Sequence, residues 1–248
     1  MHRTYVKDFE LHAYETDPEG KAQPLALLNY LQDIAGEHAA KLGFGFFDLS
    51  AKGVMWVLSR YHVKIARYPE WTWGARVRVT TWPSGHHGVF ALRDFEMTDS
   101  EGRTLALATS SWIMVSLKTK QPVRVEEHIE GRVVLPKRAL DDAFPPLPAC
   151  EDAEREAEFR VLFGDLDLNR HVNHVVYIRW ALESVPPEIL KTKRPVELEV
   201  AYKAEAFYGD AVRAGLRAER ADANPCFLHG IFNAASGVEL TRLRTGWG

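Results

Sequence analysis

The densest group of polar side chains in the chain lies between Asp165 and His174. Asp167, Asn169 and His171 place a carboxylate, a carboxamide and an imidazole at every second position, just before an apolar run that predicts a helix. Either Asp167 or Asn169 alone is explained more simply as a helix cap or an Asx turn, and His171 alone as a hydrogen-bonded structural histidine. The full set exceeds what a turn needs, and the N–H groups of a following helix can stabilise an oxyanion. The segment is therefore a candidate active site.

Other chemistries find less support in the sequence. His171 and His174 are three residues apart and could share a helical face, but no third metal ligand follows at a recognisable spacing. No Gly-x-Ser-x-Gly segment and no phosphate-binding glycine loop occur, and neither Cys150 nor Cys226 lies beside a histidine. His86 and its neighbour sit between glycines and indicate a solvated turn. We expect water as the nucleophile, and no metal or cofactor.

The elements that must position these residues follow one order, which occurs twice. A strand at 5–11 leads into a helix that begins near Pro24, and four strand-like segments follow at 54–66, 75–82, 89–98 and 105–118. The apolar stripe of the helix has the spacing of one buried face and consists of Leu27, Leu28, Leu31, Ile34, Ala35 and Leu42. In the second half a strand at 157–163, a helix at 173–184 and strands from 196 to 243 repeat this order. The predicted fold class is α+β, with an antiparallel sheet around one helix in each half.

A proline-rich segment separates the halves. We expect an N-terminal unit at 1–140, a linker at 141–154 and a C-terminal unit at 155–248, because Pro145, Pro146 and Pro148 disfavour a helix or a central strand. A gapless alignment of residues 8–11 with 158–161 brings the polar segment onto different residues in the first half. Asp17 falls on Asp167, but Glu19 falls on Asn169 and Lys21 falls on His171. We expect one active centre per chain, in the second half.

The composition limits the partners and the compartment. The 248 residues carry a formal charge of -3, with a pI near 6.4, so no overall attraction to nucleic acid or to anionic lipid is expected. Two cysteines are too few for a disulfide framework, and the sequence shows no signal segment or membrane-spanning helix. These features predict a cytoplasmic protein without membrane insertion.

The polar segment also resembles a known family. Residues 165–184, DLDLNRHVNHVVYIRWALES, closely resemble the active-site signature of the acyl-acyl carrier protein thioesterases of plants and bacteria. The first half is similar to the family in four further blocks, at 29–38, 56–61, 67–69 and 111–114. The resemblance implies a tandem double hot-dog fold, with the catalytic groups in the second unit and an acyl pocket largely in the first. It also implies an acidic partner, acyl carrier protein bearing a phosphopantetheine-linked acyl chain; a homodimer stays open.

The resemblance assigns four catalytic positions. The family's Asp, Asn and His fall on Asp167, Asn169 and His171, and its Tyr-basic-x-Glu-Cys stretch matches residues 202–206, which places the catalytic glutamate at Glu205. The family's cysteine is replaced by Ala206, so a mechanism that needs a thiolate there is excluded. Strand alternation alone groups Glu205 with Glu197, Glu199 and Lys203 on a solvated face.

The expected reaction is thioester hydrolysis that releases a fatty acid and terminates its elongation. Glu205 or His171 would activate water, Asn169 would position the thioester, and Asp167 would orient the assembly; attack by Asp167 itself, through an anhydride, stays open. Alternatives are an acyl-coenzyme A thioesterase, a hot-dog dehydratase or hydratase, and a non-catalytic acyl-binding module. Chain length depends on how residues such as Met55, Trp56, Phe90 and Trp112 pack.

Overall fold

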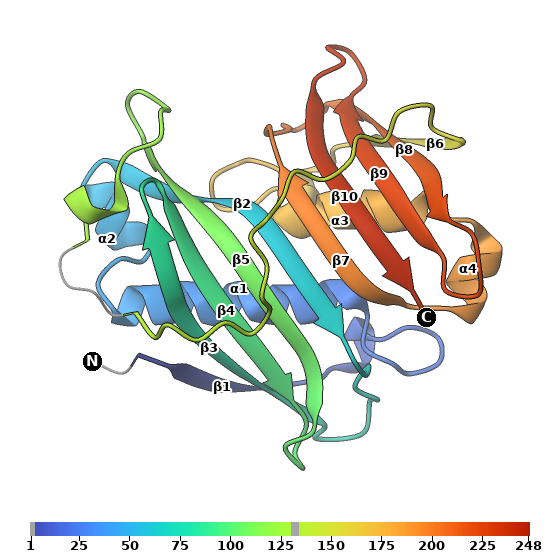
Figure 1. Cartoon of the computed structure of the whole chain (residues 1–248), viewed down its shortest axis with the longest axis horizontal. Helices are drawn as coiled ribbons and strands as arrows, with labels where there is room; N and C mark the ends of the chain where they lie inside the picture. The colour runs from blue at the N-terminus through green and yellow to red at the C-terminus, as the bar shows by residue number, and fades with distance from the viewer. Residues whose placement is uncertain (1–2, 130–133) are drawn as a thin grey trace. The chain divides into compact units, whose positions relative to one another are not determined.

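The chain divides between Ala143 and Phe144, inside the segment predicted as a linker. A computed structural model describes residues 3–129 and 134–248 (Figure 1). Each unit consists of a five-stranded antiparallel sheet and one main helix that packs against it. Each unit therefore has the α+β architecture predicted from the sequence.

Unit 1 carries its strands in the sheet order β1-β3-β4-β5-β2. The elements are β1 (Tyr5–Glu10), the 3-10 helix η1 (Ala13–Glu15), α1 (Pro24–Lys41), α2 (Phe46–Ala51), β2 (Val54–Ile65), β3 (Arg76–His87), β4 (Phe90–Thr98), β5 (Thr104–Ser116) and the 3-10 helix η2 (Val125–Glu127). Neighbouring strands pair antiparallel, and α1 contacts β1 and β3.

Helix α1 begins and ends as its residues dictate. Pro24 occupies the first turn, where a missing N–H costs no helical hydrogen bond. Five of the six stripe residues are buried; the sixth, Leu42, is the C-cap and only half-buried, because the helix ends at Lys41. The chain then returns closely on α1: a Cβ at Gly45 would lie 2.7 Å from the Cα of Ala40. A glycine is therefore required where α2 begins.

Unit 2 repeats the plan with the sheet order β7-β10-β9-β8-β6. The elements are β6 (Arg155–Arg160), the 3-10 helix η3 (Phe163–Asp165), α3 (His174–Glu183), α4 (Pro187–Thr192), β7 (Pro195–Tyr202), β8 (Ala211–Arg220), β9 (Cys226–Asn233) and β10 (Glu239–Trp247). Ile178, Trp180 and Ala181 on α3 are at most 1% exposed and pack against the sheet. Burying these side chains fixes which face of α3 turns inward.

The structure corrects two strand boundaries and adds two short helices. The strand expected at 157–163 is β6 and ends at Arg160, because residues 163–165 form η3. The strand expected to end at residue 82 continues to His87, because a register shift between Pro83 and Gly85 absorbs the proline. The helices α2 and α4 were not predicted. Among the described residues, no helix combines the length and the apolarity needed to cross a bilayer.

Candidate active site

The turn from Asp167 to His171 is held by the carboxylate of Asp167. Its Oδ1 accepts hydrogen bonds from the backbone N–H groups of Asn169, at 2.8 Å, and His171, at 3.3 Å. The backbone N–H of Asp167 donates to the carbonyl of His171 at 2.8 Å, and Arg170 takes a positive φ of 63°. This is the Asx-turn geometry expected of an aspartate at such a position. Asp167 therefore supports the backbone from which Asn169 and His171 project.

Glu205 lies in the loop after β7, which ends at Tyr202. The next residue, Ala206, is fully buried and fixes this loop through its backbone. Its N–H donates to the Tyr177 hydroxyl oxygen at 2.9 Å, and its carbonyl accepts from the N–H of Val172 at 3.1 Å. These bonds join the Glu205 loop to the first turns of α3 and to the residue after His171.

The structure brings His171 and Glu205 together. Nδ1 of His171 lies 3.1 Å from Oε1 of Glu205, with side-chain exposures of 24% and 48%. A carboxylate oxygen can only accept, so a hydrogen on Nδ1 would be attracted to Glu205, and Nε2 would then carry the lone pair of a neutral ring. The ring of Phe207 meets the imidazole edge-on, with centroids 5.2 Å apart. The pair thus places an imidazole beside a carboxylate, with both side chains partly exposed to solvent.

Asn169 lies between Asp167 and His171 in sequence and is half-buried. Its backbone N–H donates to Oδ1 of Asp167, but within the described residues its carboxamide makes no hydrogen bond to protein. A carboxamide offers two N–H donors as well as an acceptor oxygen. Asn169 can therefore donate to a substrate carbonyl.

The rest of the polar segment has structural roles. The side chain of Asn173 caps α3 by accepting from the N–H of Val175 at 3.2 Å, and its carbonyl takes the N–H of Val176. Asp165 is buried, ion-paired with Arg179 at 2.6 Å and bonded to a backbone N–H. The helix N-terminus is thus largely occupied by its own cap, which leaves less of it for an oxyanion than the sequence suggested.

Two other histidines, His174 and His86, differ from the expectations drawn from the sequence, and a third is buried. His174 is the first residue of α3, whereas His171 lies before the helix, so the two do not share a helical face; burial lowers the pKa of His174 to about 3. His86 is not in a turn: it is the last but one residue of β3 and lies beside Glu126, with Nδ1 2.9 Å from Oε1. His229 is fully buried between Ser184 and Thr245, and burial lowers its pKa to about 3.

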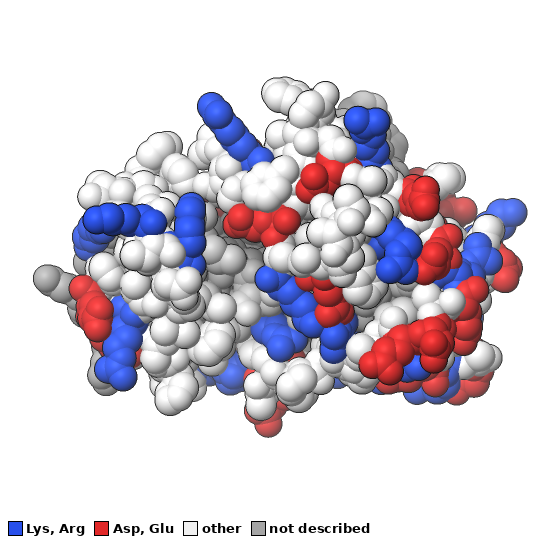
Figure 2. Space-filling view, turned by 90° about the horizontal axis from the view of Figure 1, so that it is seen from above, with Lys and Arg blue, Asp and Glu red and all other residues white. Residues whose placement is uncertain are grey.

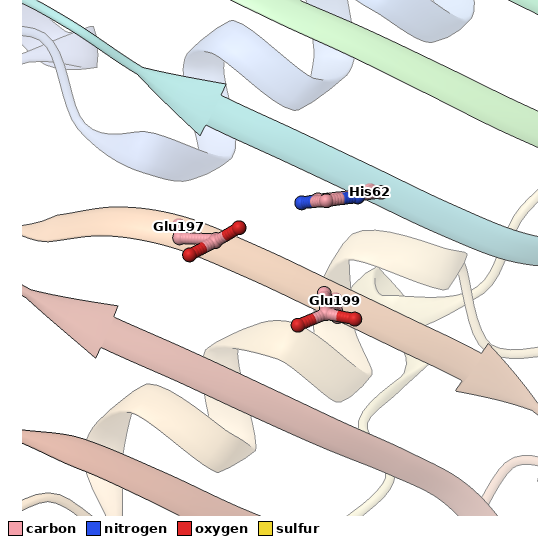
Figure 3. Close-up of side chains that lie close together, drawn as sticks. All are labelled: His62, Glu197 and Glu199. Carbon is pink, nitrogen blue, oxygen red and sulfur yellow. The ribbon is translucent and has the colours of Figure 1, made fainter. Parts of the chain in front are cut away.

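The strand-phase grouping of Glu205 was wrong, because Glu205 lies outside β7. Figure 3 shows Glu197 and Glu199 on that strand, and alternation places both on one side of it. Neither is fully solvated, and Glu199 forms an ion pair with Arg244 at 3.0 Å. Sequence reasoning also missed Tyr177, although it belongs to the apolar run of α3: its hydroxyl holds Ala206, and burial raises its pKa to about 12.

Unit 1 contains a cavity of about 580 Å³ between α1 and the sheet. Met55, Trp56 and Trp112, three of the four side chains expected to shape an acyl pocket, line it; Phe90 does not and is 40% exposed. Most of the remaining wall is apolar and includes Ala35, Ala39, Phe44, Leu92 and Val125. The cavity has the size and the character of a site for a hydrocarbon chain.

Comparison with known proteins agrees with this architecture. The family model described as the acyl-ACP thioesterase N-terminal domain matches residues 2–132, and that of the C-terminal domain matches residues 149–248. A chloroplastic palmitoyl-acyl carrier protein thioesterase from Gossypium hirsutum is 31% identical, over 98% of this chain and 63% of its own length. Its counterpart from Cuphea hookeriana is 33% identical, over 81% of this chain and 51% of its own length.

A solved structure extends the agreement to the fold. The 12:0-ACP thioesterase from Umbellularia californica superimposes with a TM-score of 0.89 at 26% identity, over 99% of this chain and 94% of that chain. The tandem double hot-dog fold is thereby confirmed. The chain spans only about half to two thirds of the length of the two plant relatives above. With both family models matched along most of its length, the chain belongs to the acyl-ACP thioesterase family.

Proposed function

We propose that this chain hydrolyses the thioester of fatty acyl-acyl carrier protein and releases a free fatty acid, which ends elongation of that chain. The observation that carries the proposal is the His171–Glu205 pair, with 3.1 Å between Nδ1 and Oε1. A carboxylate that fixes an imidazole leaves Nε2 as a general base. Family membership supplies the substrate class, because the relatives are named for acyl-acyl carrier protein substrates.

The proposed reaction begins with water held at Nε2 of His171. The imidazole takes a proton as the water oxygen attacks the thioester carbonyl carbon, and the Glu205 carboxylate stabilises the resulting imidazolium. The carboxamide of Asn169 donates to the oxyanion. The carbon–sulfur bond then breaks, and the imidazolium returns the proton to the departing pantetheine thiolate. The products are a fatty acid and the free thiol of the carrier.

Asp167 is assigned a positioning role in this scheme. Its Oδ1 already accepts two backbone N–H groups, which hold the turn that carries Asn169 and His171. Attack by Oδ2 on the thioester would turn Oδ1 into the uncharged carbonyl oxygen of an anhydride, a weaker acceptor for those two N–H groups. The contacts therefore favour direct attack by water over an anhydride intermediate.

The acyl chain is assigned to the cavity of unit 1. Its wall is largely aromatic and aliphatic, and burial of apolar surface gives about 25 cal/mol per Å² toward binding such a chain. Both cysteines are free thiols, which supports the cytoplasm as the compartment. Figure 2 shows Lys and Arg interspersed with Asp and Glu on the face that it draws, so an acidic carrier would dock on a local cluster.

The test is hydrolysis of one acyl group presented on two carriers. Purified protein is given the same acyl chain on acyl carrier protein and on coenzyme A, and the released fatty acid is measured. We expect release from both thioesters, with the higher kcat/KM on acyl carrier protein and a fall with added salt. A higher kcat/KM on coenzyme A would identify coenzyme A, and not acyl carrier protein, as the preferred carrier. Binding of acyl carrier protein without fatty acid release would refute hydrolysis.

A further inference from the structure

A charged side chain lines the otherwise apolar cavity of unit 1. Arg93, on β4, is only 7% exposed, although arginine is seldom buried without a partner. Burial lowers the pKa of Arg93 to about 10, so the guanidinium stays protonated near neutral pH. The cavity therefore carries a buried positive charge.

No carboxylate neutralises this charge among the residues that the structure describes. The adjacent Asp94 is itself fully buried. It forms an ion pair with Arg138 at 3.2 Å and accepts a hydrogen bond from the backbone N–H of Ala139 at 2.7 Å. Glu126 also lines the cavity, and it is paired with His86. Arg93 thus differs from Arg138, whose charge is balanced.

The hydrogen bonds of Arg93 leave part of the guanidinium unused. Nη1 lies 3.1 Å from Nδ1 of His38 and donates to Oγ1 of Thr81 at 3.2 Å. The N–H groups on Nε and Nη2 have no hydrogen-bond partner within residues 3–129 and 134–248. None of the nitrogens of Arg93 is among the fully buried unbonded atoms, so these donors retain contact with the cavity space.

A hydrocarbon chain that fills this cavity would remove water from donors that it cannot replace. Leaving buried donors unpaired is unfavourable, and the cost is larger for a charged group. An oxygen atom on the chain would accept from Nε or Nη2 and remove that cost. A carboxylate oxygen would in addition neutralise the charge.

We propose that the cavity of unit 1 selects acyl chains that carry an oxygen acceptor, as a hydroxyl, keto or carboxylate group, and that Arg93 is the residue that binds this oxygen. The substrate class is therefore an oxygenated fatty acyl thioester. This inference rests on the proposed thioesterase function and narrows its substrate.

The first experiment compares dodecanoyl and ω-hydroxydodecanoyl groups on acyl carrier protein. We expect kcat/KM for the hydroxylated chain to be about tenfold or more higher, the effect of one hydrogen bond to a charged group. Arg93→Met should bring the ratio of the two values to one or below, whereas Arg93→Lys, which keeps a donor, should retain part of the preference. Met55→Leu changes the cavity wall without touching charge and should leave the ratio unchanged.

A second experiment separates this inference from the proposed function. The methyl esters of dodecanoic and ω-hydroxydodecanoic acid are titrated into the intact protein, and binding is followed by tryptophan fluorescence, since Trp56 and Trp112 line the cavity. Tighter binding of the hydroxylated ester, lost in Arg93→Met, would support the inference even if no thioester were hydrolysed. The inference would be overturned if the unmodified protein bound and hydrolysed the hydroxylated chain no better than the unsubstituted chain. That outcome does not depend on whether the variants fold.

Discussion

The turn at Asp17–Lys21 in unit 1 and the turn at Asp167–His171 in unit 2 share one backbone. In each, the N–H of the aspartate donates to the carbonyl four residues later, at 2.8 Å. In each, Oδ1 accepts from the N–H groups two and four positions on, at 3.0 and 2.9 Å in unit 1 and at 2.8 and 3.3 Å in unit 2. The scaffold is thus present twice.

The loops beside the two turns also correspond. Ala22 donates its N–H to Pro69 at 2.9 Å, as Val172 does to Ala206 at 3.1 Å. One position before these acceptors lies Tyr68 in unit 1 and Glu205 in unit 2. Lys21 and Tyr68 therefore occupy the places of His171 and Glu205.

The comparison separates support from chemistry. An aspartate that makes the same bonds in both units is explained by the turn, even in the unit where Lys21 stands in place of the histidine. At these two equivalent positions only unit 2 carries an imidazole paired with a carboxylate, which is a combination that can move a proton. The fold supplies the position twice, and the residue types at two places decide which copy reacts.

After the truncation of His171, the largest expected effect is at Glu205. Glu205→Gln keeps the size of the side chain but removes the negative charge that stabilises the imidazolium, so kcat on acyl carrier protein thioesters should fall by roughly 10²-fold or more. The matched change in unit 1 is Tyr68→Phe. It should leave kcat unchanged, that is, within about twofold of the value for the unmodified protein. Equal losses of kcat in both variants would mean that Glu205 has no catalytic role that Tyr68 lacks.

Asp167 gives the next effect, and two substitutions test its role. Asp167→Asn keeps an oxygen acceptor for the two N–H groups and should retain most of kcat, whereas a covalent nucleophile would lose nearly all of it. Asp167→Ala leaves both N–H groups unpaired and should lower the free energy of unfolding by about 1–3 kcal/mol, with reduced turnover.

Asp17→Ala is the control for that pair. It removes the same scaffold from unit 1 and should lower the free energy of unfolding by a similar amount, while the protein that remains folded keeps its kcat. Urea denaturation gives the stability and steady-state hydrolysis gives kcat. Loss of kcat in folded Asp17→Ala would break the distinction between the two turns.

The smallest effect concerns the residue of each turn with positive φ. Gly20 has φ 76° and Arg170 has φ 63°. A Cβ at Gly20 would meet no atom within 4 Å, so Gly20→Ala should cost only backbone strain, about 1 kcal/mol in the free energy of unfolding. Arg170→Gly should relieve strain and raise that free energy by about 0.5 kcal/mol. Shifts of the opposite sign in urea denaturation would mean that the turns are not equivalent.

Most of the fold could be predicted from the sequence. The stripe of α1 and the Val- and Thr-rich segments gave the main helix and every strand of unit 1, because their periods reflect burial on one face. The helices α2 and α4 escaped prediction because each has only six residues, too few to show a period. Strand β3 was expected to stop near Pro83 because a proline in a strand is tolerated only at an edge or a bulge, and the bulge depends on pairing with β4.

The site was less accessible to sequence reasoning. The spacing of Asp167, Asn169 and His171 indicated the turn in unit 2. Aligning the two halves with an offset of 150 residues indicated its counterpart in unit 1, because each turn is a local feature of the sequence. Glu205 came only from family resemblance, since its approach to His171 depends on Ala206 and Tyr177 meeting across the unit. Arg93 gave no signal at all, because nothing local shows that an arginine is buried beside a cavity.

The most direct test of the account compares His171→Ala with Lys21→Ala, the same truncation at the two equivalent positions. Steady-state hydrolysis of one acyl-acyl carrier protein by each folded variant decides between the units. We predict a loss of roughly 10²–10⁴-fold in kcat for His171→Ala and no measurable loss for Lys21→Ala. Near-normal turnover by His171→Ala, or a comparable loss in Lys21→Ala, would contradict a single active centre in unit 2.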